Sequence, residues 1–267
     1  MPQRFSVEVQ GQGKDVILIH GLGSARWVWK HLAESLEATH RLHLLQINGF
    51  AGATAGVNAE GPVAAPVAVE LAEYIRSNGL QKPTVIGHSM GGEIALMLAA
   101  RYPDTVGKAV IVDAMPFYSL YLKPFASSQS MQPSADAYRQ RLLSANDQQF
   151  RQMQTVALAI LLKNQRYCEA VLQDSLTSER ATIANAMHEL MVTDLRPELG
   201  NITAPVTVIF AHDKTMGMTE DYLRGFYQLA YMGLKQVSFE MVKDSYHFVM
   251  LDQAEVFNRV VEMRKNK

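Results

Sequence analysis

Short apolar runs rich in β-branched residues alternate along the chain with longer segments of helical periodicity, and this alternation limits the fold more than any other feature. Such a pattern is typical of a mostly parallel sheet covered by helices on both faces. The predicted strands are residues 5–9, 16–19, 42–47, 84–86, 109–112, 206–210 and 237–242. The predicted helices are residues 27–37, 63–77, 90–102, 220–231 and 254–263. We therefore expect an α/β fold.

The alternation stops between residues 115 and 196, where the sequence is rich in Gln, Met, Leu and Ala and shows only helical patterns. We predict that residues 115–196 form a helical cap, inserted into a core made of residues 1–114 and 197–267. A chain of 267 residues is long enough for one large core with a modest insertion.

Composition excludes several classes of function. A content of 48% hydrophobic and 19% charged residues is typical of a soluble globular protein, and a net charge of -1 gives no basic surface for nucleic acid. No uninterrupted apolar run approaches the roughly 18 to 20 residues of a membrane span. The sequence contains no His-Glu-x-x-His run and no cysteine cluster, so we predict neither a metal site nor a cofactor.

The segment Gly87-His88-Ser89-Met90-Gly91 joins the predicted strand 84–86 to the predicted helix 90–102. In that place a Gly-x-Ser-x-Gly pattern predicts a sharp turn, in which the glycines let neighbouring backbones pass closely and the serine rises above the sheet. A turn in a nucleotide-binding sheet is the alternative, but no phosphate-loop Lys follows. Ser89 is therefore the candidate nucleophile.

A serine hydroxyl needs a base within hydrogen-bond reach and a third group that orients the base. His247 follows the last predicted strand, in a loop before the final helix, and it is the candidate base. His20 and His88 lie beside residues already assigned to turns, so we interpret them as supporting residues.

Two aspartates follow predicted strands and could orient the base. Asp213 comes after the strand 206–210 and gives the chain order Ser, Asp, His, so it is the candidate carboxylate. Asp113, after the strand 109–112, is the alternative. Proteins of this architecture more often place the acid after the later strand, which favours Asp213.

Acyl transfer also needs two backbone donors that face the developing oxyanion. The N–H of Met90, directly after the candidate nucleophile, is the first candidate. The N–H of Leu22, in the glycine-flanked turn His20-Gly21-Leu22-Gly23, is the second. This turn is not a dinucleotide fingerprint, because Arg26 stands where the third glycine would be.

These motifs together resemble the α/β-hydrolase fold family, and the resemblance covers nearly the whole chain outside the insertion. It implies a serine hydrolase with a Ser-His-Asp triad and a helical cap. The chain departs from the family at Asn48-Gly49-Phe50-Ala51-Gly52, where members commonly carry an Asp and a glycine-serine loop. Similar chains with this loop are bacterial and often exported. We leave the location open between cytoplasmic and exported with the leader removed.

Within the family, haloalkane dehalogenases and epoxide hydrolases use an aspartate where this chain has Ser89. We expect acyl-enzyme chemistry, as in a carboxylesterase that acts on small to medium esters with an apolar acyl or aromatic group. A C–C bond hydrolase, or a cofactor-free haloperoxidase or lyase, on the same triad is the first alternative. A ligand-binding protein with slow turnover is the second. The expected partner is a small-molecule substrate, and a homodimer is compatible with the sequence.

Apolar side chains of the cap and of the His247 loop are the candidates for the substrate pocket. The predicted lining residues are Met115, Phe117, Tyr118 and Phe248. Packing of the cap against the core is the alternative role for such side chains.

Overall fold

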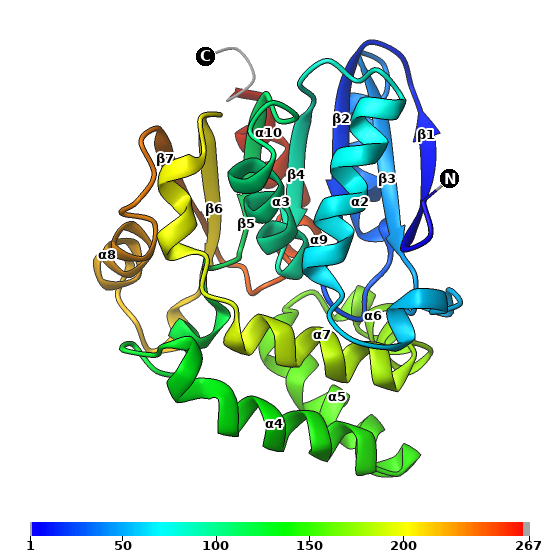
Figure 1. Ribbon diagram of the computed structural model, residues 1–267. Helices are drawn as coiled ribbons and strands as arrows, with labels where there is room; N and C mark the ends of the chain where they lie inside the picture. Colours follow the sequence, from blue (N-terminus) through cyan, green and yellow to red (C-terminus); the bar gives the residue numbers. More distant parts are fainter. Residues whose placement is uncertain (1, 264–267) are drawn as a thin grey trace.

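One sheet of seven strands forms the centre of the protein in the computed structural model, which describes residues 2–263 (Figure 1). The strands are β1 (Phe5–Gln10), β2 (Lys14–Ile19), β3 (His40–Ile47), β4 (Thr84–His88), β5 (Lys108–Val112), β6 (Val206–His212) and β7 (Val237–Lys243). They lie in the order β1-β3-β2-β4-β5-β6-β7. β1 is antiparallel to β3, and all the other neighbouring pairs are parallel. The mostly parallel sheet predicted from the sequence is confirmed.

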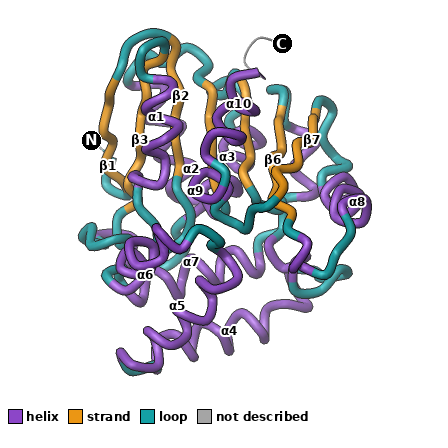
Figure 2. The backbone as a smooth tube through the Cα atoms, turned by 180° about the vertical axis from the view of Figure 1, so that it is seen from behind, coloured by secondary structure: helices purple, strands orange, loops and turns teal. Residues whose placement is uncertain are grey.

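Each face of the sheet has its own core. Ile17 and Ile19 of β2 belong to the core cluster on one face, whereas Val16 and Leu18 belong to the cluster on the other. The central strands read as continuous apolar runs because both of their faces are buried. Figures 1 and 2 show the two helical layers from opposite sides. The helices of the core are α1 (Lys30–Leu36), α2 (Ala64–Ser77), α3 (Met90–Arg101), α8 (Glu220–Ala230), α9 (Val249–Asp252) and α10 (Ala254–Met263).

Between β5 and β6 the chain forms only helices, and these lie beyond the carboxyl ends of the strands (Figure 1). They are α4 (Ser128–Ser144), α5 (Asp147–Leu161), α6 (Cys168–Leu176) and α7 (Arg180–Val192). This is the helical insertion expected from the sequence, and residues 115 and 196 remain its predicted limits. No helix within residues 2–263 combines the length and the apolar character needed to cross a bilayer.

A buried carboxylate of the cap attaches it to the core. Glu189 of α7 accepts hydrogen bonds from the amides of Val63, Ala64 and Ala65 at 2.6, 2.7 and 2.8 Å. The first amides of a helix have no partners within the helix, and negative charge is favoured at this end. The side chain of Val63, the N-cap residue of α2, cannot accept such a hydrogen bond. The cap therefore completes the start of a core helix.

The loop that departs from the family pattern also contacts the cap. The amide of Ala51 donates to Ser178 Oγ at 2.9 Å, and the amide of Glu179 donates to Gly49 O at 2.7 Å. A Cβ on Gly49, whose φ is 92°, would lie 2.6 Å from Thr182 Oγ1. Glycine is thus required at position 49 both by the backbone conformation and by the close approach of α7.

A third contact between cap and core predicts how stability varies with pH. Burial raises the pKa of Asp174 in α6 to about 6, although the hydrogen bond from Trp27 Nε1 at 2.6 Å acts in the opposite direction. The folded protein therefore binds more protons than the unfolded chain between about pH 4 and pH 6. The contribution of Asp174 to the free energy of unfolding should be fully present below this window and lost as the pH rises through it.

Denaturant unfolding of the wild type and of Asp174→Asn measures this contribution. We expect the free energy of unfolding of the wild type to fall relative to that of the variant between about pH 4 and pH 6. A difference that stays constant over this range would contradict the raised pKa of Asp174.

Candidate active site

Ser89 lies in a strained turn between β4 and α3. Its backbone has φ 53° and ψ −122°, a conformation that residues with a side chain rarely adopt. A Cβ on Gly87 would lie 2.0 Å from Gly91 O, and a Cβ on Gly91 would lie 2.2 Å from Ile19 O. Both positions therefore accept only glycine, as the motif predicts. The strain holds Ser89, which is partly exposed, at the carboxyl end of the sheet.

The ends of the two strands that flank β4, which are β2 and β5, lie close to Ser89. Its amide donates to Val112 O at 3.0 Å, so the turn lies directly beside the end of β5. On the other side, the loop that follows β2 passes very closely, because a Cβ on Gly21 would lie 3.1 Å from Ser89 Cβ. The serine is thus enclosed by the ends of β2, β4 and β5.

His247 lies in the loop between β7 and α9, and its partner is Asp113. The distance from His247 Nδ1 to Asp113 Oδ2 is 2.7 Å. An ionised carboxylate only accepts, so Nδ1 carries the hydrogen and Nε2 is left with the lone pair that a general base needs. Asp113 directly follows Val112 and, with φ 45°, has an unusual backbone conformation of its own. Ser89 and Asp113 therefore lie at the ends of adjacent strands.

This pairing corrects the prediction that Asp213 orients the base. Asp213 Oδ2 lies 2.5 Å from Lys163 Nζ, and Asp213 Oδ1 accepts hydrogen bonds from the hydroxyl and the amide of Thr215 at 2.6 and 2.9 Å. The Lys163 ammonium, together with the donors of Thr215, holds the pKa of Asp213 far below its usual range. Asp213 thus joins the turn after β6 to the cap. Asp113 has the position beside His247 that was predicted for Asp213.

His88 and His20 are both buried and neutral. His88 Nε2 lies 3.0 Å from His247 O and must donate to it, while burial and the nearby His247 lower the pKa of His88. His20 accepts from the amide of Ile47 at Nε2, at 3.0 Å, and donates from Nδ1 to Gly21 O, at 2.8 Å. Burial lowers the pKa of His20 to about 4. Both histidines therefore hold loops of the site, in agreement with the supporting role proposed for them.

The two predicted oxyanion donors belong to the segments next to Ser89. Met90 is the first residue of α3, where an amide has no acceptor within the helix, and Leu22 follows the closely approaching Gly21. Within residues 2–263, neither amide donates to another backbone group outside the regular elements. Their role in stabilising an oxyanion stays a prediction.

The predicted pocket residues differ in their surroundings. The ring of Phe248 lies 4.9 Å from that of His88 and 5.7 Å from that of His247, between ring centroids, so it contacts the site directly. Met115 and Phe117 are 1% and 0% exposed and belong to the main core cluster, and Tyr118 is partly buried against it. Contact with a substrate remains a prediction for all four residues.

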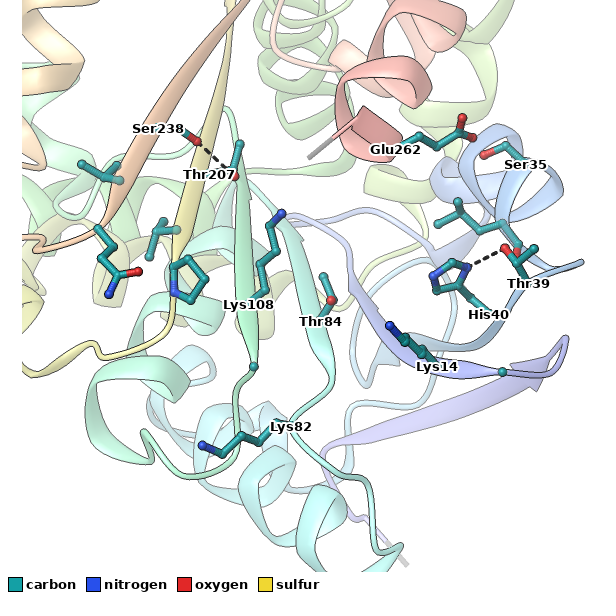
Figure 3. Close-up of a pocket in the computed structure, with 17 residues that line it drawn as sticks. Lys14, Ser35, Thr39, His40, Lys82, Thr84, Lys108, Thr207, Ser238 and Glu262 are labelled. Atoms are coloured by element: carbon teal, nitrogen blue, oxygen red, sulfur yellow. Dashed lines mark hydrogen bonds between the residues drawn. The ribbon is translucent and has the colours of Figure 1, made fainter. Parts of the chain in front are cut away.

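A hollow of about 1210 Å³ lies at the opposite edge of the sheet (Figure 3). Its lining includes Lys14, Thr84 and Lys108, the first residues of β2, β4 and β5. Ser89 follows the other end of β4, so the length of that strand, roughly 15 Å, separates it from Thr84. This hollow is therefore not where a substrate meets Ser89.

The order of the strands distinguishes the two acidic residues. Asp113 follows β5, which is hydrogen-bonded to the strand that carries Ser89, whereas β6 is one strand further away. The sequence does not give the sheet order, and both aspartates follow predicted strands. No sequence signal indicated the contact of Lys163 with Asp213.

Comparison with known proteins agrees with this fold. A family model of the alpha/beta hydrolase fold matches residues 15–254. A relative named pimeloyl-[acyl-carrier protein] methyl ester esterase, from Yersinia enterocolitica, is 26% identical over 207 residues, which make up 76% of each chain.

Two solved structures show the same architecture over nearly all of the chain. An esterase from Exiguobacterium antarcticum has a TM-score of 0.79 and 20% identity, and covers 99% of this chain and 98% of its own. An enol-lactonase from Burkholderia xenovorans has a TM-score of 0.77 and 16% identity, and covers 98% of this chain and 96% of its own. At these identities the two likenesses concern the fold alone.

Proposed function

Because the chain belongs to the α/β-hydrolase family, we propose that it hydrolyses carboxylic esters, with Ser89 as nucleophile, His247 as base and Asp113 as orienting carboxylate. The observation that carries this proposal is the 2.7 Å hydrogen bond from His247 Nδ1 to Asp113, beside the strained turn of Ser89. This bond selects the imidazole tautomer whose Nε2 can accept a proton from a hydroxyl.

The first half of the reaction forms an acyl-enzyme. Ser89 Oγ attacks the ester carbonyl carbon while His247 Nε2 takes the hydroxyl proton, and Asp113 stabilises the imidazolium that results. The amides of Leu22 and Met90 stabilise the negative charge on the former carbonyl oxygen. The intermediate then collapses, the C–O bond to the alcohol breaks, and His247 returns the proton to the leaving alkoxide.

The second half releases the acid and restores Ser89. A water molecule attacks the acyl carbon and loses a proton to His247, and the Ser89 oxygen leaves and takes that proton back. No redox step or group other than water enters this cycle. The carboxylic acid, the alcohol and the free serine are the products.

The relatives and the contacts near His247 favour an ester with an apolar acyl part. The Yersinia enterocolitica relative is named as a methyl ester esterase of pimeloyl-[acyl-carrier protein]. Phe248, which lies against His88 and His247, offers an apolar surface next to the reacting atoms. We expect small to medium alkyl esters with an apolar acyl or aromatic group to be the best substrates.

A panel of nitrophenyl esters tests the reaction class and the acyl preference together. Acetate, butyrate, octanoate and dodecanoate esters should be hydrolysed, with kcat/KM highest for a short or medium chain. A fluorophosphonate probe, followed by peptide mapping, should label Ser89. Faster cleavage of a diketone than of any ester would instead indicate a C–C bond hydrolase, and tight binding with negligible turnover would indicate a ligand-binding protein.

A further inference from the structure

The second carboxylate oxygen of Asp113 has partners that the acyl-transfer steps do not use. Asp113 Oδ1 accepts a hydrogen bond from the amide of Ala211 at 3.0 Å and from the hydroxyl of Tyr227 at 3.1 Å. Tyr227 lies on α8 and is 2% exposed. A buried hydroxyl of a core helix thus contacts the carboxylate on the side opposite His247.

The donor and acceptor of each hydrogen bond near Asp113 can be assigned. The hydroxyl of Tyr121 lies 2.7 Å from that of Tyr227, and geometry alone leaves either one as the donor. Asp113 can only accept, so Tyr227 must give its single hydroxyl hydrogen to Asp113. Tyr121 must then donate to the oxygen of Tyr227. A series of hydrogen bonds therefore runs from Tyr121 through Tyr227 and Asp113 to His247.

Tyr227 keeps its proton under all ordinary conditions. Burial, followed by the charge of Asp113, raises the pKa of Tyr227 well above its usual value. Its ring stacks on that of Phe210, with centroids 4.3 Å apart and planes at 18°, so the direction of the hydroxyl is set by core packing. A rigid, protonated donor of this kind can hold a carboxylate in one orientation.

Tyr121 comes from a different part of the molecule. It ends the short helix η3 (Tyr118–Tyr121), in the segment that leads from β5 into the cap, and it is 43% exposed as a whole residue. Its hydroxyl nevertheless reaches the buried hydroxyl of Tyr227. The segment at the entrance to the cap is thus connected by hydrogen bonds to Asp113.

We infer that Tyr227 is a positioning residue that orients Asp113 against His247, and that Tyr121 supports this role from the entrance of the cap. The inference rests on the proposed function, in which Asp113 orients the base. Tyr227 does not touch the substrate and acts only through Asp113. Its loss should therefore reduce kcat rather than weaken substrate binding.

The test compares three tyrosine-to-phenylalanine variants on one nitrophenyl ester. Tyr227→Phe keeps the stacking on Phe210 but removes the donor to Asp113, and kcat should fall about tenfold with KM changed less than about twofold. Tyr121→Phe removes only the outer donor, and kcat should fall about twofold to threefold. Tyr231→Phe is the matched control, because this buried hydroxyl donates to Ala114 O at 2.8 Å, and kcat should not change.

A fourth measurement places Tyr227→Phe in the Asp113→Asn background. If Tyr227 acts through Asp113, the second substitution should change the residual rate by less than about twofold. Thermal unfolding of every variant shows whether each is folded at the assay temperature.

The outcomes separate this inference from the proposed function. Full activity in Tyr227→Phe, a loss equal to that of Tyr231→Phe, or the same loss in the Asp113→Asn background would each overturn the positioning role. If Asp113→Asn alone were nearly as active as the wild type, Asp113 itself would not be the orienting carboxylate, and the proposed triad would fail.

Discussion

Replacing Ser89 with alanine should lower kcat for ester hydrolysis by about a thousandfold or more. In the proposed mechanism the variant loses the atom that forms the acyl-enzyme, while Leu22, Met90 and His247 remain in place. The residual rate should be that of a bound ester attacked directly by water. Initial rates with the best nitrophenyl ester, compared at saturating substrate, measure the loss.

The fold should tolerate this change, which makes the result easy to interpret. Alanine removes one oxygen from a partly exposed side chain, and the strained backbone of the turn is no worse for alanine than for serine. Ser77→Ala, at the exposed end of α2, is the control and should keep full activity. Fluorophosphonate labelling should disappear from Ser89→Ala only. Activity or labelling retained in this variant would place the nucleophile elsewhere.

The sheet could be predicted because its local patterns agree with the final packing. The central strands are buried on both faces, so their sequences are continuous apolar runs. In the first four residues of the edge strand β1, more buried and exposed residues alternate, as in a strand with one covered face. The turn at Ser89 could be predicted from the sequence in the same way. Its glycines are required because a Cβ at either position would lie 2.0 or 2.2 Å from a backbone oxygen, and this requirement leaves a fixed residue pattern in the sequence.

The identity of the acid could not be read in the same way. Asp113 and Asp213 both follow a parallel strand, so both reach the carboxyl edge of the sheet, and local sequence gives them the same signal. The choice depends on contacts between residues far apart in the chain. Lys163 binds Asp213 across 50 residues, and Tyr227 binds Asp113 across 114. Neither contact leaves a periodic or local pattern.

The cap shows the same limit. Its helices were expected from composition and the absence of strand signals, but its attachment to the core depends on single polar side chains. Glu189 reaches the start of α2 and Asp174 reaches Trp27, both across more than 100 residues. Such contacts depend on the relative placement of two finished layers, which a helical period does not specify.

Asp113→Asn should lower kcat by about three to four orders of magnitude, whereas Asp213→Asn should lower it less than about tenfold. Asparagine at position 113 can present its amide N–H to His247 Nδ1, which would stabilise the tautomer that has its hydrogen on Nε2. That nitrogen could then no longer accept the proton of Ser89. The amide would also fail to stabilise the imidazolium that forms during attack. Rates for both variants on the same nitrophenyl ester give the comparison.

Asp213→Asn acts on a different part of the molecule, so its effect should appear in stability rather than in rate. The variant keeps the hydrogen bonds from Thr215 but leaves Lys163, whose side chain is 41% exposed, without its ion pair. Because water can solvate this ammonium, the loss of stability should be small, visible as a slightly lower unfolding temperature. The reverse ranking of the two rates would make Asp213 the acid. The hydrogen bond between His247 and Asp113 would then have no catalytic role.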